Sequence, residues 1–547
     1  MSTLKNLRQK MSTFLEPHTV FVTSRTSSFP RRMIDLIRCL GIVILSVQMF
    51  ISTEMASLGQ FPVLKPNSLS PRNAVDRIEG SLSQVKNELE MLGASLFDND
   101  AALSIPGRTP YNAANDIILV WNQVMLDANA ADTLQAIPDQ PGPCRGSRAF
   151  AIVSVAMFDA WNSIHRKYTP FLVGLKGFNS ANERAAVSKA ALDSLVSLYP
   201  KQAARFQTAY SSAMDSVPNG PARNRGIELG TLVANAILAN RSNDNSNLNL
   251  PYTFKNHPGY HQPDPLHPNQ GAYVPHWGFV DPFVIEDADE YLCPPPPALD
   301  SQEYAFAYEE VYNYGGNGIT TPTHRTPEQT TIGIFWGYDG SIGLGTPPRL
   351  YNQIVRTIAI KKRNSVEANA RLFALVNLAM ADAGIQCWYT KYFYEFWRPV
   401  IGIQQGNADG NSNTRCDPLW LPLGAPATNG TGDGVDFTPP FPAYSSGHAA
   451  FGAAALYTVA AFYGTTRIPF SFTSDEFNGI NKGSDGIARP IVTRTYRTLE
   501  DAVWENAFSR VYLGIHWSFD ATAGVDSGKR IAIKVSTSAL RRLRGKN

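Results

Sequence analysis

The stretch "FPAYSSGHAAFGAAAL", residues 441–456, places a Ser-Gly-His triplet between a proline-rich run and an alanine-rich segment typical of a helix. Glycine costs about 1 kcal/mol relative to alanine inside a helix, so the triplet fits better at a helix start. There Ser446 can act as the N-cap, and the unpaired N–H groups that follow form a ready anion site. The stretch therefore predicts a helix that starts near Gly447, with His448 beside a bound anion. A purely structural cap is the alternative.

Composition limits the class of protein. The chain has 547 residues, 44% of them hydrophobic and 17% charged, which suits a globular protein with one large core or two ordinary ones. The formal net charge of +2 gives no reason to expect nucleic acid or an acidic membrane surface as a partner. Five scattered cysteines without a CxxC spacing indicate neither a zinc site nor a disulfide framework. A single bridge, such as Cys144 with Cys293, stays open.

The first part of the chain, residues 1–105, reads as an extension of a domain that covers residues 106–547. Basic residues precede an apolar run at 39–51 that is short for a membrane span and closer to the core of a signal peptide. The segment near 31–56 therefore predicts export, periplasmic or secreted, and no membrane span. A packed helix, or a start placed too far upstream, is the alternative. The oligomeric state is left open.

Helical patterns dominate from Asn115 onward. They are clearest at 115–126, 148–164, 183–199, 223–241, 368–399 and 499–535. A loop rich in proline, histidine and asparagine covers about 242–282, and a loop of that length usually wraps a surface or borders a site. The predicted fold is mainly α, a helical bundle core with long loops.

A second segment that could bind an anion is "WYTKYFYEFWRP", residues 388–399. Lys391 and Arg398 are seven residues apart, so in one helix they would share a face about 10 Å apart. Pro399 is expected to end that helix. Two cations in an aromatic stretch are costly to bury unless they share an anion. The alternative is that both extend to solvent from a surface helix.

A third segment is "SRVYLGIHWSFD", residues 509–520. On an unbroken helix Arg510 and His516 would point in different directions, but Gly514 makes a break plausible. Asp520, four residues after His516, could hold the second nitrogen of the imidazole. It could equally be an ordinary first-turn carboxylate of a helix.

Together the three segments offer a set of donors without a cysteine or carboxylate cluster. The set comprises three cations, a hydroxyl with helix N–H groups, and two histidines. Such donors suit a tetrahedral oxyanion with two or more negative charges, whereas a divalent metal cation would require carboxylates. One histidine could bind the central atom of the anion and the other could move protons.

In this order the motifs K-x6-R-P, P-S-G-H and S-R-x5-H resemble those of the vanadium-dependent haloperoxidases and the related acid phosphatases. Here they read "KYFYEFWRP", "PAYSSGH" and "SRVYLGIH". Residues 336–356 and 368–388 look like the vanadium chloroperoxidases in particular, and the similarity extends over about 115–533. Ser445 stands where the family usually has proline, which removes backbone rigidity but no catalytic atom. The family fold implies two four-helix bundles.

The resemblance implies roles for named residues around one vanadate per chain. His516 would be the vanadium ligand and His448 the acid–base group. The expected partners of the equatorial oxygens are Lys391, Arg398, Ser446, Gly447 and Arg510. Asp339 would pair with one arginine, and Trp388 and Phe441 would line the halide site.

The resemblance also implies a reaction. Hydrogen peroxide would oxidise bromide, and chloride too, to hypohalous acid, which halogenates a small organic acceptor. His448 would help to deprotonate the peroxide, and Lys391 would make one of its oxygens more electrophilic. An acid phosphatase with His516 as the nucleophile is the first alternative, because one cage can serve vanadate and a phosphoryl-transfer transition state. A non-catalytic oxyanion-binding protein is the second.

Overall fold

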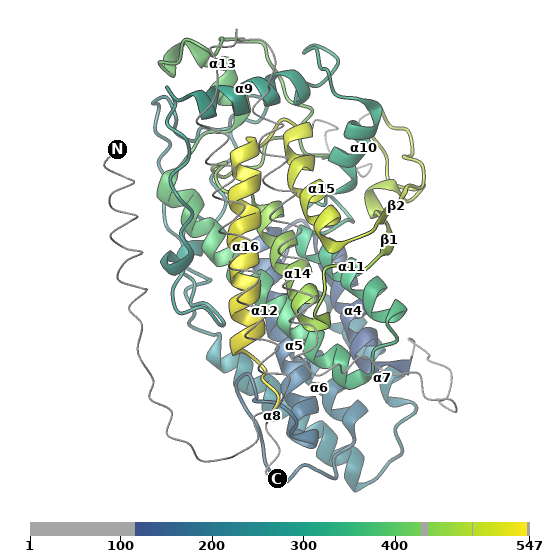
Figure 1. Cartoon of the computed structure of the whole chain (residues 1–547). Coiled ribbons are helices and arrows are strands. Elements are labelled where there is room, and N and C mark those ends of the chain that lie inside the picture. Colours follow the sequence, from purple (N-terminus) through teal and green to yellow (C-terminus); the bar gives the residue numbers. More distant parts are fainter. Residues whose placement is uncertain (1–114, 428–435, 484, 544–547) are drawn as a thin grey trace, which may run out of the picture. The chain divides into compact units, whose positions relative to one another are not determined.

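The computed structural model describes residues 115–427, 436–483 and 485–543, and all of them lie in one compact unit, Glu90–Asn547. The predicted extension at 1–105 and its signal-like segment lie outside the described residues. The described part is mostly helical, as predicted, with the helices packed in two groups (Figure 1).

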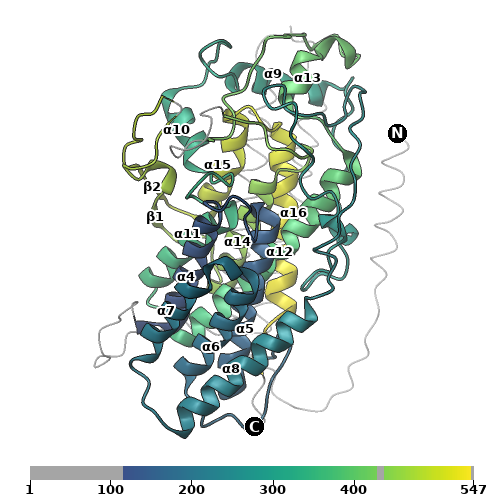
Figure 2. The same cartoon turned by 180° about the vertical axis from the view of Figure 1, so that it is seen from behind.

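The first group contains the first five helices of the described chain (Figure 2). Its members are α4 (Ile117–Asp132), α5 (Gly142–His165), α6 (Glu183–Leu198), α7 (Ala203–Met214) and α8 (Pro221–Asn240). Asp116 caps α4, and Asn182 caps α6 by accepting from the Ala185 N–H. Helix α6 packs against both α5 and α8.

The second group carries the three segments singled out above. Its members are α11 (Pro347–Lys361), α12 (Val366–Tyr394), α14 (Gly447–Tyr463), α15 (Leu499–Tyr512) and α16 (Ser518–Ser538). Helices α12, α14 and α16 pack against one another, and α14 also contacts α11 and α15. The long helix α12 packs against α5 as well, so it joins the two groups.

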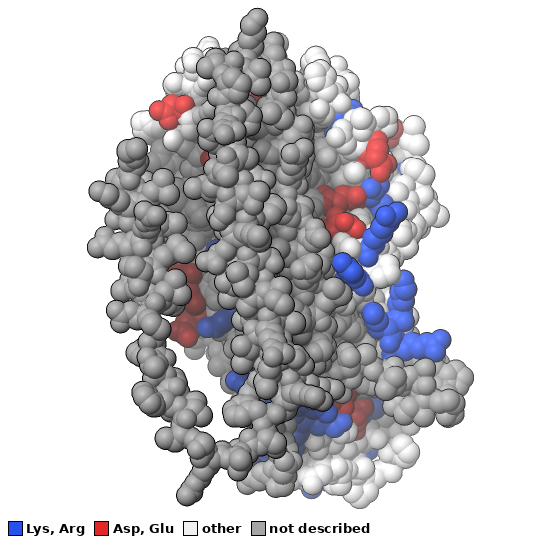
Figure 3. Space-filling model, in the orientation of Figure 1, with Lys and Arg blue, Asp and Glu red and all other residues white. Residues whose placement is uncertain are grey.

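Shorter elements pack against the helices of the second group and against one another. These are α9 (Gln302–Tyr314), α10 (Pro327–Phe335), α13 (Pro399–Gln404) and the antiparallel strands β1 (Phe470–Thr473) and β2 (Thr493–Tyr496), with Phe470 opposite Tyr496. Single 3-10 turns lie at Pro200–Gln202, Trp277–Phe279, Asp289–Tyr291, Gly406–Ala408 and Asp475–Phe477. On the face shown in Figure 3, basic and acidic side chains are mixed near the strands, where Arg494 pairs with Glu328 and Glu505.

Glycines let the second group pack closely where the site forms. A Cβ at Gly528 of α16 would lie 2.3 Å from the Ala450 carbonyl oxygen, and one at Gly524 would lie 2.6 Å from that of Ser446. Gly226 and Gly230 of α8 approach α6 in the same way. The α16 backbone therefore rests on the first turns of α14, so the start of α14 lies next to the start of α16.

Three further expectations can be compared with the described residues. Residues 242–282 form a long loop, as predicted. Within it, Trp277–Phe279 forms a 3-10 turn. Cys144 and Cys293 are both free, so the bridge left open between them does not form. Among the described helices, none is long and apolar enough to cross a membrane.

Candidate active site

The opening stretch folds as its sequence predicts. Helix α14 begins at Gly447, and the Ser446 side chain caps it by accepting from the Ala449 N–H at 3.4 Å. The Ser446 N–H donates to the Asp520 carbonyl at 2.9 Å, which ties this helix start to α16. His448 lies in the first turn, and Tyr351 and Asn506 donate to its carbonyl oxygen. The helix start is therefore held from three directions.

The second segment corrects a prediction. Helix α12 ends at Tyr394, where Glu395 takes a left-handed conformation with φ of 51°, so Lys391 and Arg398 do not share a helix. Arg398 is extended, and Pro399 begins α13 instead of ending α12. Proline suits the first position of a helix, because the N–H that it lacks would have no acceptor within the helix there. It also keeps the preceding residue, here Arg398, out of the helical region. Both cationic side chains are fully buried, so the surface-helix alternative is wrong too.

The third segment breaks where predicted. Helix α15 ends at Tyr512, Gly514 has a φ of 72°, and α16 begins at Ser518. Asp520 has both roles that were considered for it: its Oδ2 accepts from His516 Nδ1 at 2.8 Å and from the Trp517 N–H at 3.0 Å. The carboxylate therefore caps the new helix and orients His516 at once.

His516 is held as a neutral imidazole with a defined tautomer. Its Nδ1 donates to Asp520, so Nε2 is unprotonated and accepts from Arg398 Nη1 at 3.0 Å. Burial, followed by the charges of Arg398 and Lys391, holds the pKa of His516 well below its usual range. An unprotonated ring nitrogen whose partner nitrogen faces a carboxylate is the arrangement typical of a metal-binding histidine.

His448 has the opposite tautomer. Its Nε2 lies 2.7 Å from the Gly337 carbonyl oxygen, which can only accept, so Nε2 carries the proton and Nδ1 is free of it. Burial, and then the charge of Arg510, lowers the pKa of His448 to about 4. The predicted pairing of Asp339 with an arginine is present, since its Oδ1 lies 2.6 Å from Arg510 Nη2. His448 is thus a neutral base at ordinary pH.

The cations are buried and incompletely paired. Lys391 Nζ donates to the carbonyl oxygens of Pro442 and Ala443 at 2.7 and 3.0 Å, and burial lowers its pKa to about 7. Arg398 Nη2 and the Nε and Nη1 atoms of Arg510 are buried without a hydrogen-bond partner among the described residues. Unpaired buried guanidinium nitrogens are costly, and an oxyanion is the group that satisfies them.

Some of these groups line a cavity of about 260 Å³. His448, His516, Arg510, Asp339 and Gly447 line its polar end, whereas Lys391, Arg398 and Ser446 are not among the residues that line it. The apolar wall contains Trp388 and Phe441, whose ring centroids are 4.8 Å apart, with several prolines and further rings. The predicted site residues are therefore brought together, some at the cavity and some behind it.

Tyr273 and His261 are among the residues near this cavity that the sequence did not predict. Tyr273 lines it from the long loop, and the one available signal was that such a loop often borders a site. His261 is buried beside Lys391 and Arg398, whose charges add to burial in lowering its pKa well below the usual value. The sequence around His261 gives no sign of a site. His261 reaches the site because its segment pairs with the turn after α12, where the His261 N–H donates to the Glu395 carbonyl oxygen.

Comparison with known proteins identifies the class. Residues 106–276 match the model of the vanadium chloroperoxidase N-terminal domain, and residues 371–545 match that of the VCPO second helical-bundle domain. The vanadium chloroperoxidase of Curvularia inaequalis is 34% identical over 500 residues, covering 76% of this chain and 81% of the relative. The chain therefore belongs to the vanadium-dependent haloperoxidase family, and it is an enzyme of the peroxidase type.

Solved structures have the same fold. A bacterial vanadium-dependent iodoperoxidase superposes with a TM-score of 0.64 at 24% identity, covering 80% of this chain and 100% of that one. The holo form of a bacterial vanadium-dependent chloroperoxidase gives a TM-score of 0.59 at 15% identity, covering 75% and 95%. Vanadate is the cofactor of this family, and the donors described above fit that anion.

Proposed function

We propose that the chain binds one vanadate and uses hydrogen peroxide to oxidise bromide and chloride to hypohalous acid, which halogenates a small organic acceptor. The observation that carries this proposal is the neutral His516, whose unprotonated Nε2 accepts from Arg398 Nη1 and which lines one cavity with Arg510. Arg398 Nη2 and the Nε and Nη1 atoms of Arg510 are buried without partners among the described residues, so the same place offers cationic donors to an anion. Membership of the haloperoxidase family supports the same reaction class. In this proposal residues 106–547 form the catalytic domain, consistent with the two matched ranges.

Each donor has a part in holding the anion. His516 Nε2 would bind vanadium, while Arg398, Arg510 and Lys391 would neutralise the charge on the oxygens. Ser446 and the Gly447 N–H at the start of α14 would add uncharged hydrogen bonds. Asp339 would keep Arg510 in place through their 2.6 Å ion pair.

Bound vanadate supplies a Lewis-acidic centre that activates peroxide without changing its own oxidation state. His448 would take a proton from hydrogen peroxide at Nδ1, because Nε2 already donates to Gly337. The buried Lys391 ammonium would stabilise negative charge that develops on a peroxide oxygen. Trp388 and Phe441 would exclude water on the halide side, which strengthens these electrostatic interactions.

The test compares purified protein with and without added vanadate. With vanadate, hydrogen peroxide and bromide or chloride, we expect monochlorodimedone to be halogenated, and bound vanadium to be measurable. Hydrolysis of p-nitrophenyl phosphate by the vanadium-free protein is measured in parallel. Phosphatase turnover without any halogenation in the loaded protein would overturn the proposal and favour the acid phosphatase.

A further inference from the structure

We infer that Tyr273 is a third ring of the halide wall, beside Trp388 and Phe441, and that it determines how well the enzyme discriminates between chloride and bromide. The inference rests on the proposed function. Its evidence is independent of the motifs, since Tyr273 comes from the long loop 242–282 and belongs to none of the three segments.

The ring of Tyr273 packs against both members of the wall. Its centroid lies 6.0 Å from that of Trp388, with the planes at 80°, and 6.1 Å from that of Phe441. All three residues line the same cavity as His448 and His516. One continuous aromatic surface therefore faces the histidines, and a residue from the loop completes it.

Hydrogen bonds fix Tyr273 on several sides. Its N–H donates to the Pro440 carbonyl at 2.8 Å, one residue before Phe441. Its own carbonyl accepts from Tyr392 Oη at 2.8 Å and from Trp388 Nε1 at 3.4 Å. The phenol donates to the Pro141 carbonyl at 2.7 Å. Because the hydroxyl is engaged in that way, the ring and not the hydroxyl is what Tyr273 offers to the cavity.

The start of α5 leaves room for this ring. Gly142 has a φ of 73°, and a Cβ there would lie 2.3 Å from Tyr273 Oη and 2.5 Å from Cζ. A side chain at this position would therefore be strained and would also displace the phenol.

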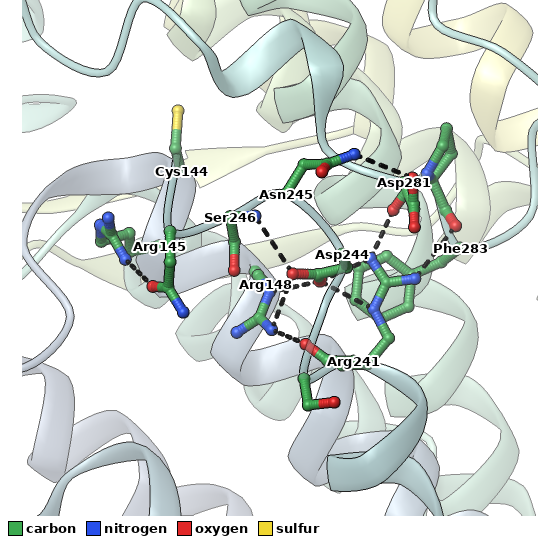
Figure 4. Close-up of polar contacts among 12 residues, drawn as sticks. Cys144, Arg145, Arg148, Arg241, Asp244, Asn245, Ser246, Asp281 and Phe283 are labelled. Carbon is green, nitrogen blue, oxygen red and sulfur yellow. Dashed lines mark hydrogen bonds and ion pairs between the residues drawn. The ribbon is translucent and has the colours of Figure 1, made fainter. Parts of the chain in front are cut away.

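The loop that carries Tyr273 is closed at its base by a buried ion cluster. Asp244 lies between Arg148 of α5 and Arg241, with Nε–Oδ2 distances of 2.7 and 2.9 Å (Figure 4). Arg241 Nη1 reaches across to the Pro282 carbonyl at 3.2 Å, and the Asp281 N–H donates to the Asp244 carbonyl at 3.1 Å. Both ends of the loop that carries Tyr273 are thus held together beside α5.

The physical role of the third ring is to keep the halide and the reacting oxygen dry. A halide must shed water before it is oxidised, and aromatic ring edges carry partial positive charge that an anion can face. Chloride is hydrated more strongly and is harder to oxidise than bromide, so it depends more on a closed wall. Removing the ring should therefore affect chloride first.

The experiment compares Tyr273→Leu with Tyr273→Phe as the matched control. In the vanadate-loaded enzyme we expect Tyr273→Leu to lower kcat/KM for chloride by about tenfold relative to bromide. Tyr273→Phe keeps the ring, so the chloride-to-bromide ratio should stay near that of the wild type. Vanadate affinity, measured by calorimetry, should be unchanged in both variants, since Tyr273 is not among the residues proposed to hold vanadate.

A wild-type chloride-to-bromide ratio in Tyr273→Leu would overturn the inference. So would an equal loss in Tyr273→Phe, because the hydroxyl and not the ring would then matter. Chloride binding is followed separately by broadening of the chloride NMR signal, which should be weaker for Tyr273→Leu than for the wild type. If the wild type binds chloride and vanadate but oxidises neither halide, the proposed function fails while this measurement still decides the role of Tyr273.

Discussion

The two histidines of the site differ in which nitrogen carries the proton, and that difference separates their roles. His516 donates from Nδ1 to a carboxylate, which leaves Nε2 unprotonated for its proposed role as the ligand atom. His448 donates from Nε2 to the Gly337 carbonyl, which leaves Nδ1 unprotonated for its proposed role as the base. Each tautomer is set by the acceptor that the fold places opposite the ring, so neither imidazole can replace the other.

Alanine variants of the two histidines should therefore differ. We expect His516→Ala to lose vanadate binding, because it removes the one proposed bond from the protein to vanadium. His448→Ala should bind vanadate yet lose most turnover, on the order of 10²-fold or more for a missing acid–base group. Calorimetry measures the first property and steady-state kinetics the second. Wild-type vanadate affinity in His516→Ala would show that the ligand assignment is wrong.

The pKa of His448 predicts a pH dependence. Because the pKa is lowered to about 4, the ring stays neutral between about pH 4 and 6.5, where an exposed imidazole would become protonated. The unfolded chain binds that proton in this window and the folded chain does not, so His448 makes folding less favourable as the pH falls below 6.5. Proton NMR of the vanadium-free protein, with His448→Ala for assignment, should show titration near pH 4. Titration near 6.5 would contradict the burial argument.

We expect the proposed halide oxidation to depend on single residues too. At the position of Phe441, the chloroperoxidases that the chain resembles also have phenylalanine, whereas algal bromoperoxidases commonly have histidine. An imidazole there could donate a hydrogen bond to the reacting peroxide oxygen and lower its oxidising power, whereas the phenyl ring excludes water from that oxygen. Phe441→His should thus depress chloride oxidation more than bromide oxidation. Equal loss for both halides would refute this reason, and a vanadate-loaded wild type without chloride activity between about pH 5 and 7 would remove the premise.

At the scale of the elements, the site depends on how closely α16 approaches α14. The start of α14 carries Ser446 and His448, and the residues just before α16 carry His516. Because Gly528 has no side chain, the two backbones can come together, and the Ser446 N–H donates to the Asp520 carbonyl. The distance between the two histidines is therefore a consequence of helix packing.

We expect Gly528→Ala to destabilise the fold by about 1–3 kcal/mol, because the added methyl group would overlap a backbone carbonyl that cannot move easily. Thermal unfolding measures the change. Gly271→Ala is the matched control, since a Cβ there meets nothing within 4 Å. Equal melting temperatures for the two variants would mean that the helices can separate without cost.

At the scale of the whole molecule, the anion site joins segments that are distant in the chain. Lys391 belongs to α12, Arg398 precedes α13 and Ser446 precedes α14. Arg510 lies in the last turn of α15, and His516 lies in the break before α16. The repulsion among these buried cations is relieved when an anion binds. Anion binding should accordingly stabilise the whole fold.

Saturating vanadate should raise the melting temperature, with about 2.7 kcal/mol expected at a concentration 100 times the dissociation constant. Phosphate should compete, because the cage recognises charge and tetrahedral shape. The measurement is a vanadate titration in phosphate and in a buffer without oxyanions, with His516→Ala as the control that should show little vanadate effect. Identical vanadate affinity in the two buffers would argue against a shared site.

Features that depend on neighbouring residues were accessible from the sequence alone. Capping by Ser446, the helix start at Gly447 and the break at Gly514 each involve residues within one turn of each other, so local backbone preferences determine them. The mainly helical fold follows from apolar periodicity along the chain. The kind of anion followed from the types of donors in three short motifs.

Features that depend on distant contacts were decided only by the tertiary structure. The turn between α12 and Arg398 is held by pairing with the segment of His261, and the tautomer of His448 depends on Gly337, 111 residues earlier. Tyr273 meets Trp388, 115 residues later, because its backbone bonds to Pro440 and Tyr392 hold it there. Such positions arise from packing and from buried groups that must find partners, and no local pattern in the chain encodes which partner that will be.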